Sequence, residues 1–184
     1  NIMPVKVFGI HEGTTTDAYI AQGIYYAVDH GANMINISID LLGKRYDATT
    51  LNDAFDYAKQ HGVIIITGAG NSNINVDSNV SVKTDNLVVV SSTSEGPFIK
   101  STENPAKDPN SSYGNTVSLS APGTVGGLSA DPSYGVNSSG LISFAGTSSS
   151  SPQVAAVFAL VKSKYPTWTW DQVKKRVFST ADNV

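Results

Sequence analysis

Two hydrophobic patterns alternate along this chain. Short, nearly unbroken apolar runs predict strands, and stretches whose apolar residues recur every three or four positions predict amphipathic helices. We expect strands at Met3–Gly9, Asn33–Ile39, Val63–Gly70, Asn86–Ser92 and Asn115–Gly123. We expect helices at Thr15–Gly31, Ala48–Gly62, Ser148 to about Tyr165, and Thr169–Ala181. This alternation with short connections is typical of an α/β fold with a mostly parallel sheet.

The predicted strand at Val63–Gly70 is apolar on both of its faces. That is typical of a parallel strand covered by helices on both sides. Right-handed crossovers place helices on both faces of such a sheet, so we predict a three-layer α/β/α arrangement. The segments Thr93–Asn110 and Gly123–Asn137 are rich in Gly, Ser, Pro and Asn, and we expect both to be surface loops.

Composition narrows the class of protein. The 184 residues fit one domain, and 40% of them are hydrophobic, which is enough for a sizeable core. The formal charge is −3 and the 12 Lys and Arg residues are scattered, so we expect no nucleic-acid partner. There is no cysteine, which excludes disulfides and cysteine metal sites. No apolar run reaches the length of a membrane span.

Four consecutive serines, Ser148 to Ser151, stand before Pro152 at the start of a predicted helix. A helix cap needs only one hydroxyl. Proline is tolerated in the first turn of a helix, so the helix should begin between Thr147 and Ser149. Ser148 then lies at the positive end of the helix dipole, where free N–H groups can stabilise an oxyanion. The alternatives at this point are a nucleophilic serine and a simple cap.

The run GTSSSSPQVAAVFALVKSKYP resembles the nucleophile segment of the subtilases, the subtilisin-like serine proteases. In the motif G-T-S-x-[AS]-[ST]-P the first serine is the nucleophile, which implies that Ser148 is catalytic. VIIITGAGNSN is similar to the segment that carries the oxyanion donor, which implies Asn71. The same resemblance assigns the preceding Gly68, Ala69 and Gly70 to substrate binding.

A third segment, GANMINISI, is similar to the family's strand that pairs with the substrate backbone. The resemblance therefore implies that Ser38 and Ile39 bind substrate. Asp40 follows them where the family usually has Gly. We hypothesise that its carboxylate favours basic substrate side chains, and a solvated loop aspartate is at least as good an interpretation.

A serine nucleophile needs a base and a carboxylate that orients the base. The family's D-[ST]-G and H-G-T-H motifs are absent here. His30 and His61 each precede a glycine at a predicted helix end, where a helix C-cap is the better interpretation, and His11 lies in a predicted loop. We therefore expect residues 1–184 to be the C-terminal portion of one subtilisin-like domain, incomplete at its N-terminal side.

The missing Asp and His leave three interpretations open, which are truncation, nicking of a mature enzyme, and a natural pseudoprotease. We expect an upstream segment of the same protein, or a second chain, to supply both groups. Without it, the strands at Met3–Gly9 and Asn33–Ile39 lose their common neighbour. We then expect either that the chain needs a second polypeptide, which supplies that neighbour, or that the two strands pair directly with each other.

The resemblance implies a serine endopeptidase that acts on polypeptides and is secreted or held at the cell surface. It implies no cofactor or metal in this chain, with structural calcium possible in the complete enzyme. One alternative is a catalytically dead scaffold that binds peptides by strand addition along Ser38 and Ile39. Another is a nucleotide-binding module, suggested only by the GAG at Gly68, and it lacks a third glycine and an acidic partner.

Overall fold

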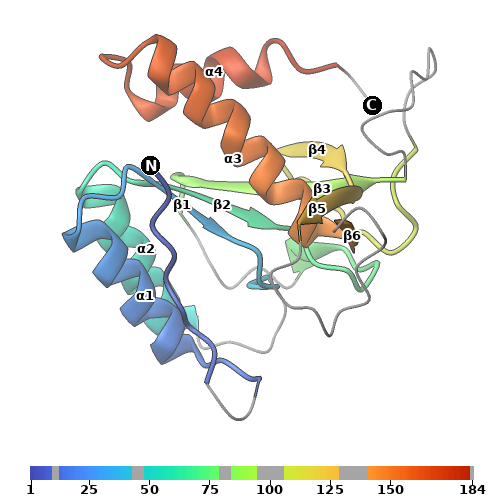
Figure 1. Cartoon of the computed structure of the whole chain (residues 1–184), viewed down its shortest axis with the longest axis horizontal. Coiled ribbons are helices and arrows are strands. Elements are labelled where there is room, and N and C mark those ends of the chain that lie inside the picture. The colour runs from blue at the N-terminus through green and yellow to red at the C-terminus, as the bar shows by residue number, and fades with distance from the viewer. Residues whose placement is uncertain (10–12, 43–47, 79–83, 95–105, 129–140, 183–184) are drawn as a thin grey trace.

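A four-stranded parallel sheet forms the centre of the computed structural model, which describes residues 1–9, 13–42, 48–78, 84–94, 106–128 and 141–182 (Figure 1). The strand order is β1-β2-β3-β4, and all three neighbouring pairs are parallel. The strands are β1 (Met34–Ile37), β2 (Ile64–Gly68), β3 (Leu87–Thr93) and β4 (Leu119–Pro122). The prediction of a mostly parallel sheet is confirmed.

Helices cover both faces of this sheet. The pair α1 (Asp17–Asp29) and α2 (Ala48–Gln60) lies on one side, and α3 (Thr147–Lys164) with α4 (Trp170–Phe178) lies on the other (Figure 1). A short 3-10 turn, η1 (Val76–Ser78), follows β2. The predicted three-layer α/β/α arrangement is confirmed.

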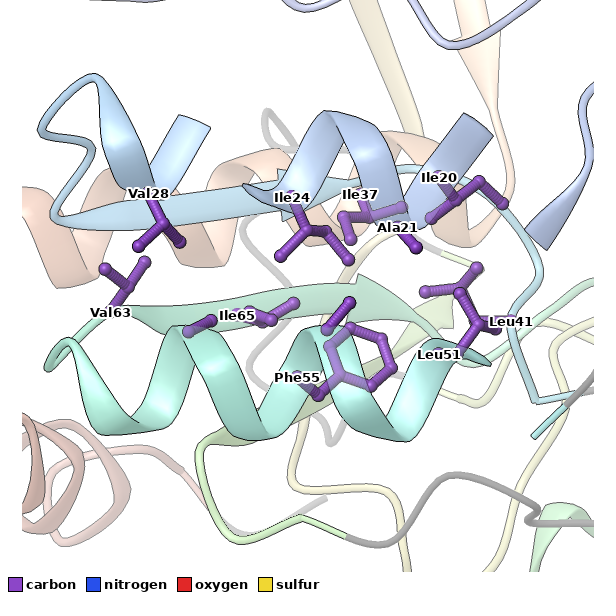
Figure 2. Close-up of a cluster of buried hydrophobic side chains, with 12 residues drawn as sticks. Ile20, Ala21, Ile24, Val28, Ile37, Leu41, Leu51, Phe55, Val63 and Ile65 are labelled. Carbon is purple, nitrogen blue, oxygen red and sulfur yellow. The ribbon is translucent and has the colours of Figure 1, made fainter. Parts of the chain in front are cut away.

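Alternate residues of β2 point into two separate apolar cores. Ile65 joins the core between the sheet and the pair α1 and α2, and Figure 2 shows the side chains from these elements meeting there. Ile64 and Ile66 join the core under α3 and α4, which includes the fully buried Phe158. All five residues of β2 are buried, which explains why this strand is apolar on both faces.

Side-chain caps fix the starts of the first and last helices. Thr16 Oγ1 accepts from Tyr19 N at 3.3 Å and begins α1. Thr169 and Gln172 form a reciprocal capping box at the start of α4. Gly31, at φ +83°, takes the chain out of α1 in a conformation that suits glycine.

The prediction of a strand at Met3–Gly9 is wrong. This segment lies along α1 and joins no sheet. A Cβ on Gly23 would come within 2.5 Å of Val7 Cγ1, so the missing side chain of Gly23 is what lets the segment approach the helix. Thr15 Oγ1 donates to Val7 O at 2.6 Å. Helix contacts therefore hold a segment whose apolar pattern suggested a strand.

The expectation of a loop at Gly123–Asn137 is wrong at its start. An antiparallel pair forms there between β5 (Thr124–Leu128) and β6 (Leu141–Ala145), and residues 129–140 lie outside the described part. A Cβ on Gly127 would come within 2.5 Å of the Phe144 ring, so the aromatic ring of one strand covers the bare glycine of the other. The glycine-rich composition concealed this pairing.

The expected loop at Thr93–Asn110 is also shorter than predicted, because Thr93 ends β3. Residues 95–105 lie outside the described residues. Over the described ranges, no helix combines the length and the apolar character that crossing a membrane requires.

Candidate functional site

Only one of the four serines at the start of α3 is exposed. Ser148 is exposed, whereas Ser149, Ser150 and Ser151 are buried. Ser150 Oγ lies 3.1 Å from Ala121 O and 3.0 Å from Pro122 O, so it ties α3 to β4. The row therefore contains one hydroxyl at the surface and three that belong to the packing below it.

Ser148 and Ser38 hold each other through two hydrogen bonds. Ser148 Oγ donates to Ser38 O at 3.2 Å, and Ser38 Oγ donates to Ser148 O at 3.0 Å. Ser151 Oγ shares a further bond of 3.2 Å with Ser38 Oγ, and Asn36 Nδ2 donates to the same oxygen at 3.0 Å. Ser38 and Ile39 lie just beyond the last residue of β1, so the strand end and the start of α3 meet here.

Asn71 caps α3 from another part of the chain. Its Oδ1 accepts from Thr147 N at 2.9 Å, a helix N–H that the cap residue Gly146 does not serve with a side chain. A Cβ on Gly146, at φ +86°, would lie 2.7 Å from that oxygen, which only glycine avoids. With Oδ1 engaged, the Asn71 NH₂ group is left to donate, and it has no acceptor among the described residues.

The glycines before Asn71 allow β2 to approach α3 closely. Gly68 lies against Thr147, since a Cβ there would be 2.7 Å from Thr147 Oγ1. Gly70 N donates to that same hydroxyl at 3.2 Å. Gly68, Ala69 and Gly70 are all buried, so this short run supports the surface around Asn71 from beneath.

Asp40 rests against the backbone next to Asn71. A Cβ on Gly70, at φ +97°, would lie 2.9 Å from the Asp40 carboxylate. Asp40 itself is exposed. The structure thus brings together three segments, residues 38–40 after β1, residues 70–71 after β2, and residues 147–148 at the start of α3.

The two described histidines lie at helix ends, as predicted. His30 Nδ1 donates to Tyr26 O at 2.8 Å, and the two rings stack with centroids 3.9 Å apart. His61 Nδ1 donates to Tyr57 O at 2.9 Å. His11 lies outside the described residues. Within the described part of the chain, the partner of Ser148 Oγ is a carbonyl and not a base.

Asp77 holds the far end of the loop that begins at Asn71. Its carboxylate accepts from Asn115 N at 2.7 Å, from Thr116 N at 2.8 Å and from Thr116 Oγ1 at 2.7 Å. These bonds, with that from Asn115 N first, lower the pKa of Asp77 below its ordinary value of 3.8. Motif analysis missed this contact because no short motif joins residues so far apart in sequence.

The described residues contain no group of three or more His, Cys, Asp or Glu that could hold a metal ion.

The model of the subtilase family matches residues 1–184. This chain belongs to the subtilase family. Thus the resemblance seen in the sequence is confirmed, and Ser148, Asn71 and Ser38 form a candidate site of a subtilase. The structure supports the same conclusion, because the α/β layers agree with those of solved relatives.

Named relatives of this subtilase are proteases. This chain is 34% identical over 187 residues to subtilisin DY of Bacillus licheniformis, and the match covers 100% of this chain and 62% of that protein. It is 30% identical to a thermostable alkaline protease of Halalkalibacterium halodurans, covering 98% of this chain and 45% of the relative. The chain therefore spans about half the length of these relatives.

Solved structures show the same fold. A cold-adapted subtilisin-like serine proteinase superposes with a TM-score of 0.76 at 26% identity, covering 96% of this subtilase and 58% of that chain. Fervidolysin of Fervidobacterium pennivorans, described as a keratinolytic enzyme related to subtilisin, gives a TM-score of 0.70 at 29% identity. That superposition covers 92% of this chain and 26% of the fervidolysin chain.

Proposed function

We propose that this chain is the C-terminal portion of a subtilisin-type serine endopeptidase, with Ser148 as its nucleophile. The observation that carries the proposal is the setting of Ser148. It is the one exposed serine of the row, it lies at the N-terminus of α3, and the next residue toward the N-terminus bonds Asn71. The positive end of the helix dipole favours the negative charge that develops during acyl transfer.

In the proposed reaction, Ser148 Oγ forms a bond to the scissile carbonyl carbon as a base removes its proton. The oxyanion is held by the NH₂ group of Asn71 and by Ser148 N. The base returns the proton to the leaving amine, and water then hydrolyses the acyl-enzyme. The bond from Asn71 Oδ1 to Thr147 N supports this role, because it orients the amide and leaves its nitrogen free to donate.

Ser38 and Ile39 are the proposed contacts for the substrate backbone. Ser38 O now accepts from Ser148 Oγ at 3.2 Å. A substrate strand that donated a backbone N–H to Ser38 O would take that acceptor and release the hydroxyl for attack. Gly68, Ala69 and Gly70 would serve the substrate indirectly, by supporting Asn71 and Asp40 from beneath.

The base and its orienting carboxylate would come from a segment outside these 184 residues, either upstream in the same protein or on a second chain. Two observations support this. Both described histidines are engaged at helix ends. In addition, β1 pairs only with β2 among the described strands, so no described strand occupies its other edge. Any structural calcium would likewise belong to that segment, and the relatives' class suggests a protein that acts outside the cell or at its surface.

The test is hydrolysis of a denatured, fluorescently labelled polypeptide by the complete protein, meaning this chain with the segment that supplies His and Asp. We expect Ser148→Ala to abolish hydrolysis. We expect Asn71→Ala to lower kcat by about 10²–10³-fold with little change in KM, the range known for loss of this donor in subtilisin.

Ser72→Ala is the matched control, since Ser72 is exposed and next to Asn71, and its activity should be nearly unchanged. Full activity in Ser148→Ala would refute the proposal. A complete protein that binds the polypeptide without cleaving it would favour the dead scaffold instead.

We also propose that Asp40 favours substrates with basic side chains near the scissile bond. Its exposed carboxylate lies against Gly70, one residue before Asn71. In the complete protein, Asp40→Gly and the charge-only variant Asp40→Asn should both lower the ratio of kcat/KM for Arg- over Leu-containing peptides. The decrease should be about fivefold at most, since one exposed charge pair contributes up to about 1 kcal/mol. An unchanged ratio in both variants would contradict the proposed role of Asp40.

A further inference from the structure

The loop that carries the proposed oxyanion donor is tied to residues 107–116. Ser112 N donates to Gly70 O at 2.9 Å, and Asn73 N donates to Asn110 O at 2.9 Å. These two bonds fall on either side of the donor in the sequence. The segment 107–116 therefore fixes the backbone path from which the donor's side chain projects.

Lys107 is the centre of this attachment. Its Nζ donates to Ser111 O at 2.8 Å, to Asp108 O at 2.9 Å and to Asn73 Oδ1 at 3.2 Å. The same group lies 5.5 Å from the centre of the Tyr113 ring. An ammonium group has three N–H donors, and all three have an oxygen acceptor here. The ammonium group of Lys107 is thus held by hydrogen bonds to three oxygen atoms.

Lys107 contacts the loop at Asn73, a residue with an uncommon backbone conformation. Asn73 has φ +51°, the only positive φ among the described residues other than glycine. This conformation costs residues other than glycine free energy, less for asparagine than for most, and surrounding contacts help to hold it. Asn73 is held from both its backbone and its side chain, two residues after Asn71.

We propose that Lys107 is a positioning residue for Asn71. Its ammonium group fixes the side chain of Asn73 and, with it, the turn that aims the Asn71 NH₂ group at the oxyanion. The proposal rests on the proposed function for its effect on catalysis, but the attachment of the loop can be measured without any activity. Charge-assisted hydrogen bonds are the stronger kind, which suits them to hold an exposed turn.

The experiment compares wild type with Lys107→Met, which keeps the length of the side chain and removes the charge. In the complete protein we expect kcat to fall by about tenfold with KM unchanged, because a misplacement of about 1 Å costs up to about 10²-fold. Lys107→Arg should restore most of kcat. Lys175→Met, which removes an exposed lysine from α4, is the matched control and should leave kcat unchanged.

Hydrogen exchange supplies the readout that does not depend on catalysis. The amide of Asn73 should exchange faster in Lys107→Met than in wild type, while amides of β3 keep their rates. Equal exchange at Asn73 would overturn the proposal, whether or not the protein is a protease. A lower thermal midpoint with unchanged kcat, or a higher KM with unchanged kcat, would overturn it too. Faster exchange at Asn73 in a protein without hydrolase activity would instead confirm the attachment and refute the proposed function.

Discussion

Asp77 links the stability of the site loop to pH. Its hydrogen bonds from Asn115 and Thr116 lower its pKa in the folded state below 3.8. A carboxyl group whose pKa is lowered on folding stabilises the fold above its unfolded pKa. That contribution is lost as the pH falls through the folded value.

We therefore expect Asp77→Asn to lower the thermal midpoint at pH 7, with the difference from wild type shrinking as the pH falls below about 4. Thermal unfolding at a series of pH values would measure this. Asp53→Asn, at an exposed position of α2, is the control and should track wild type throughout. A constant difference between Asp77→Asn and wild type at every pH would contradict the assignment.

At the residue scale, the sequence points to candidate catalytic residues but not to the residues that support them. Ser148 and Asn71 could be proposed as site residues from the sequence because each stands in a long local motif. Sequence could not tell that Ser149 to Ser151 are buried, since burial depends on β1 and β4 arriving from elsewhere. The Lys107 contact was equally hidden, because its partners Asn73 and Ser111 share no periodic pattern with it.

Among the elements, α3 carries the proposed nucleophile and also contributes to one of the two cores. Phe158 is fully buried between the sheet and α4, where its ring meets Phe178 at a centroid distance of 6.3 Å. We expect Phe158→Ala to lower the free energy of unfolding by about 3–5 kcal/mol, since it removes a large side chain from a packed site. Chemical denaturation would measure the change.

Leu160, on the same helix, is 71% exposed and serves as the matched control. Leu160→Ala should change the free energy of unfolding by no more than about 0.5 kcal/mol. A cost for Leu160→Ala comparable to that for Phe158→Ala would mean that α3 is buried on the face that this structure exposes.

Element prediction succeeded where local pattern and tertiary packing agree. β2, α1 and α4 were predicted from their apolar patterns. Met3–Gly9 failed because an apolar alternating segment becomes a strand only beside another strand, and here α1 is its neighbour. β5 failed for the opposite reason, since pairing with β6 outweighs the weak strand propensity of its glycines.

At the scale of the whole molecule, the chain holds a proposed nucleophile, Ser148, and a proposed oxyanion donor, Asn71, and Ser148 Oγ has no hydrogen bond to a base within the described part. The carbonyl of Ser38 accepts from Ser148 Oγ where a base would be needed to activate it. The edge of β1 that pairs with no described strand lies close by in the fold, because Ser38 follows β1 directly. We therefore expect one added segment both to extend the sheet and to complete the site.

The most direct test is labelling with a serine-reactive fluorophosphonate, with the modified residue identified by peptide mass spectrometry. The probe should modify Ser148, and no other serine, in the complete protein that includes the His- and Asp-bearing segment. This chain alone should remain unlabelled, because a serine without a base is a weak nucleophile. A folded complete protein in which Ser148 stays unmodified, or in which another serine takes the label, would contradict the account.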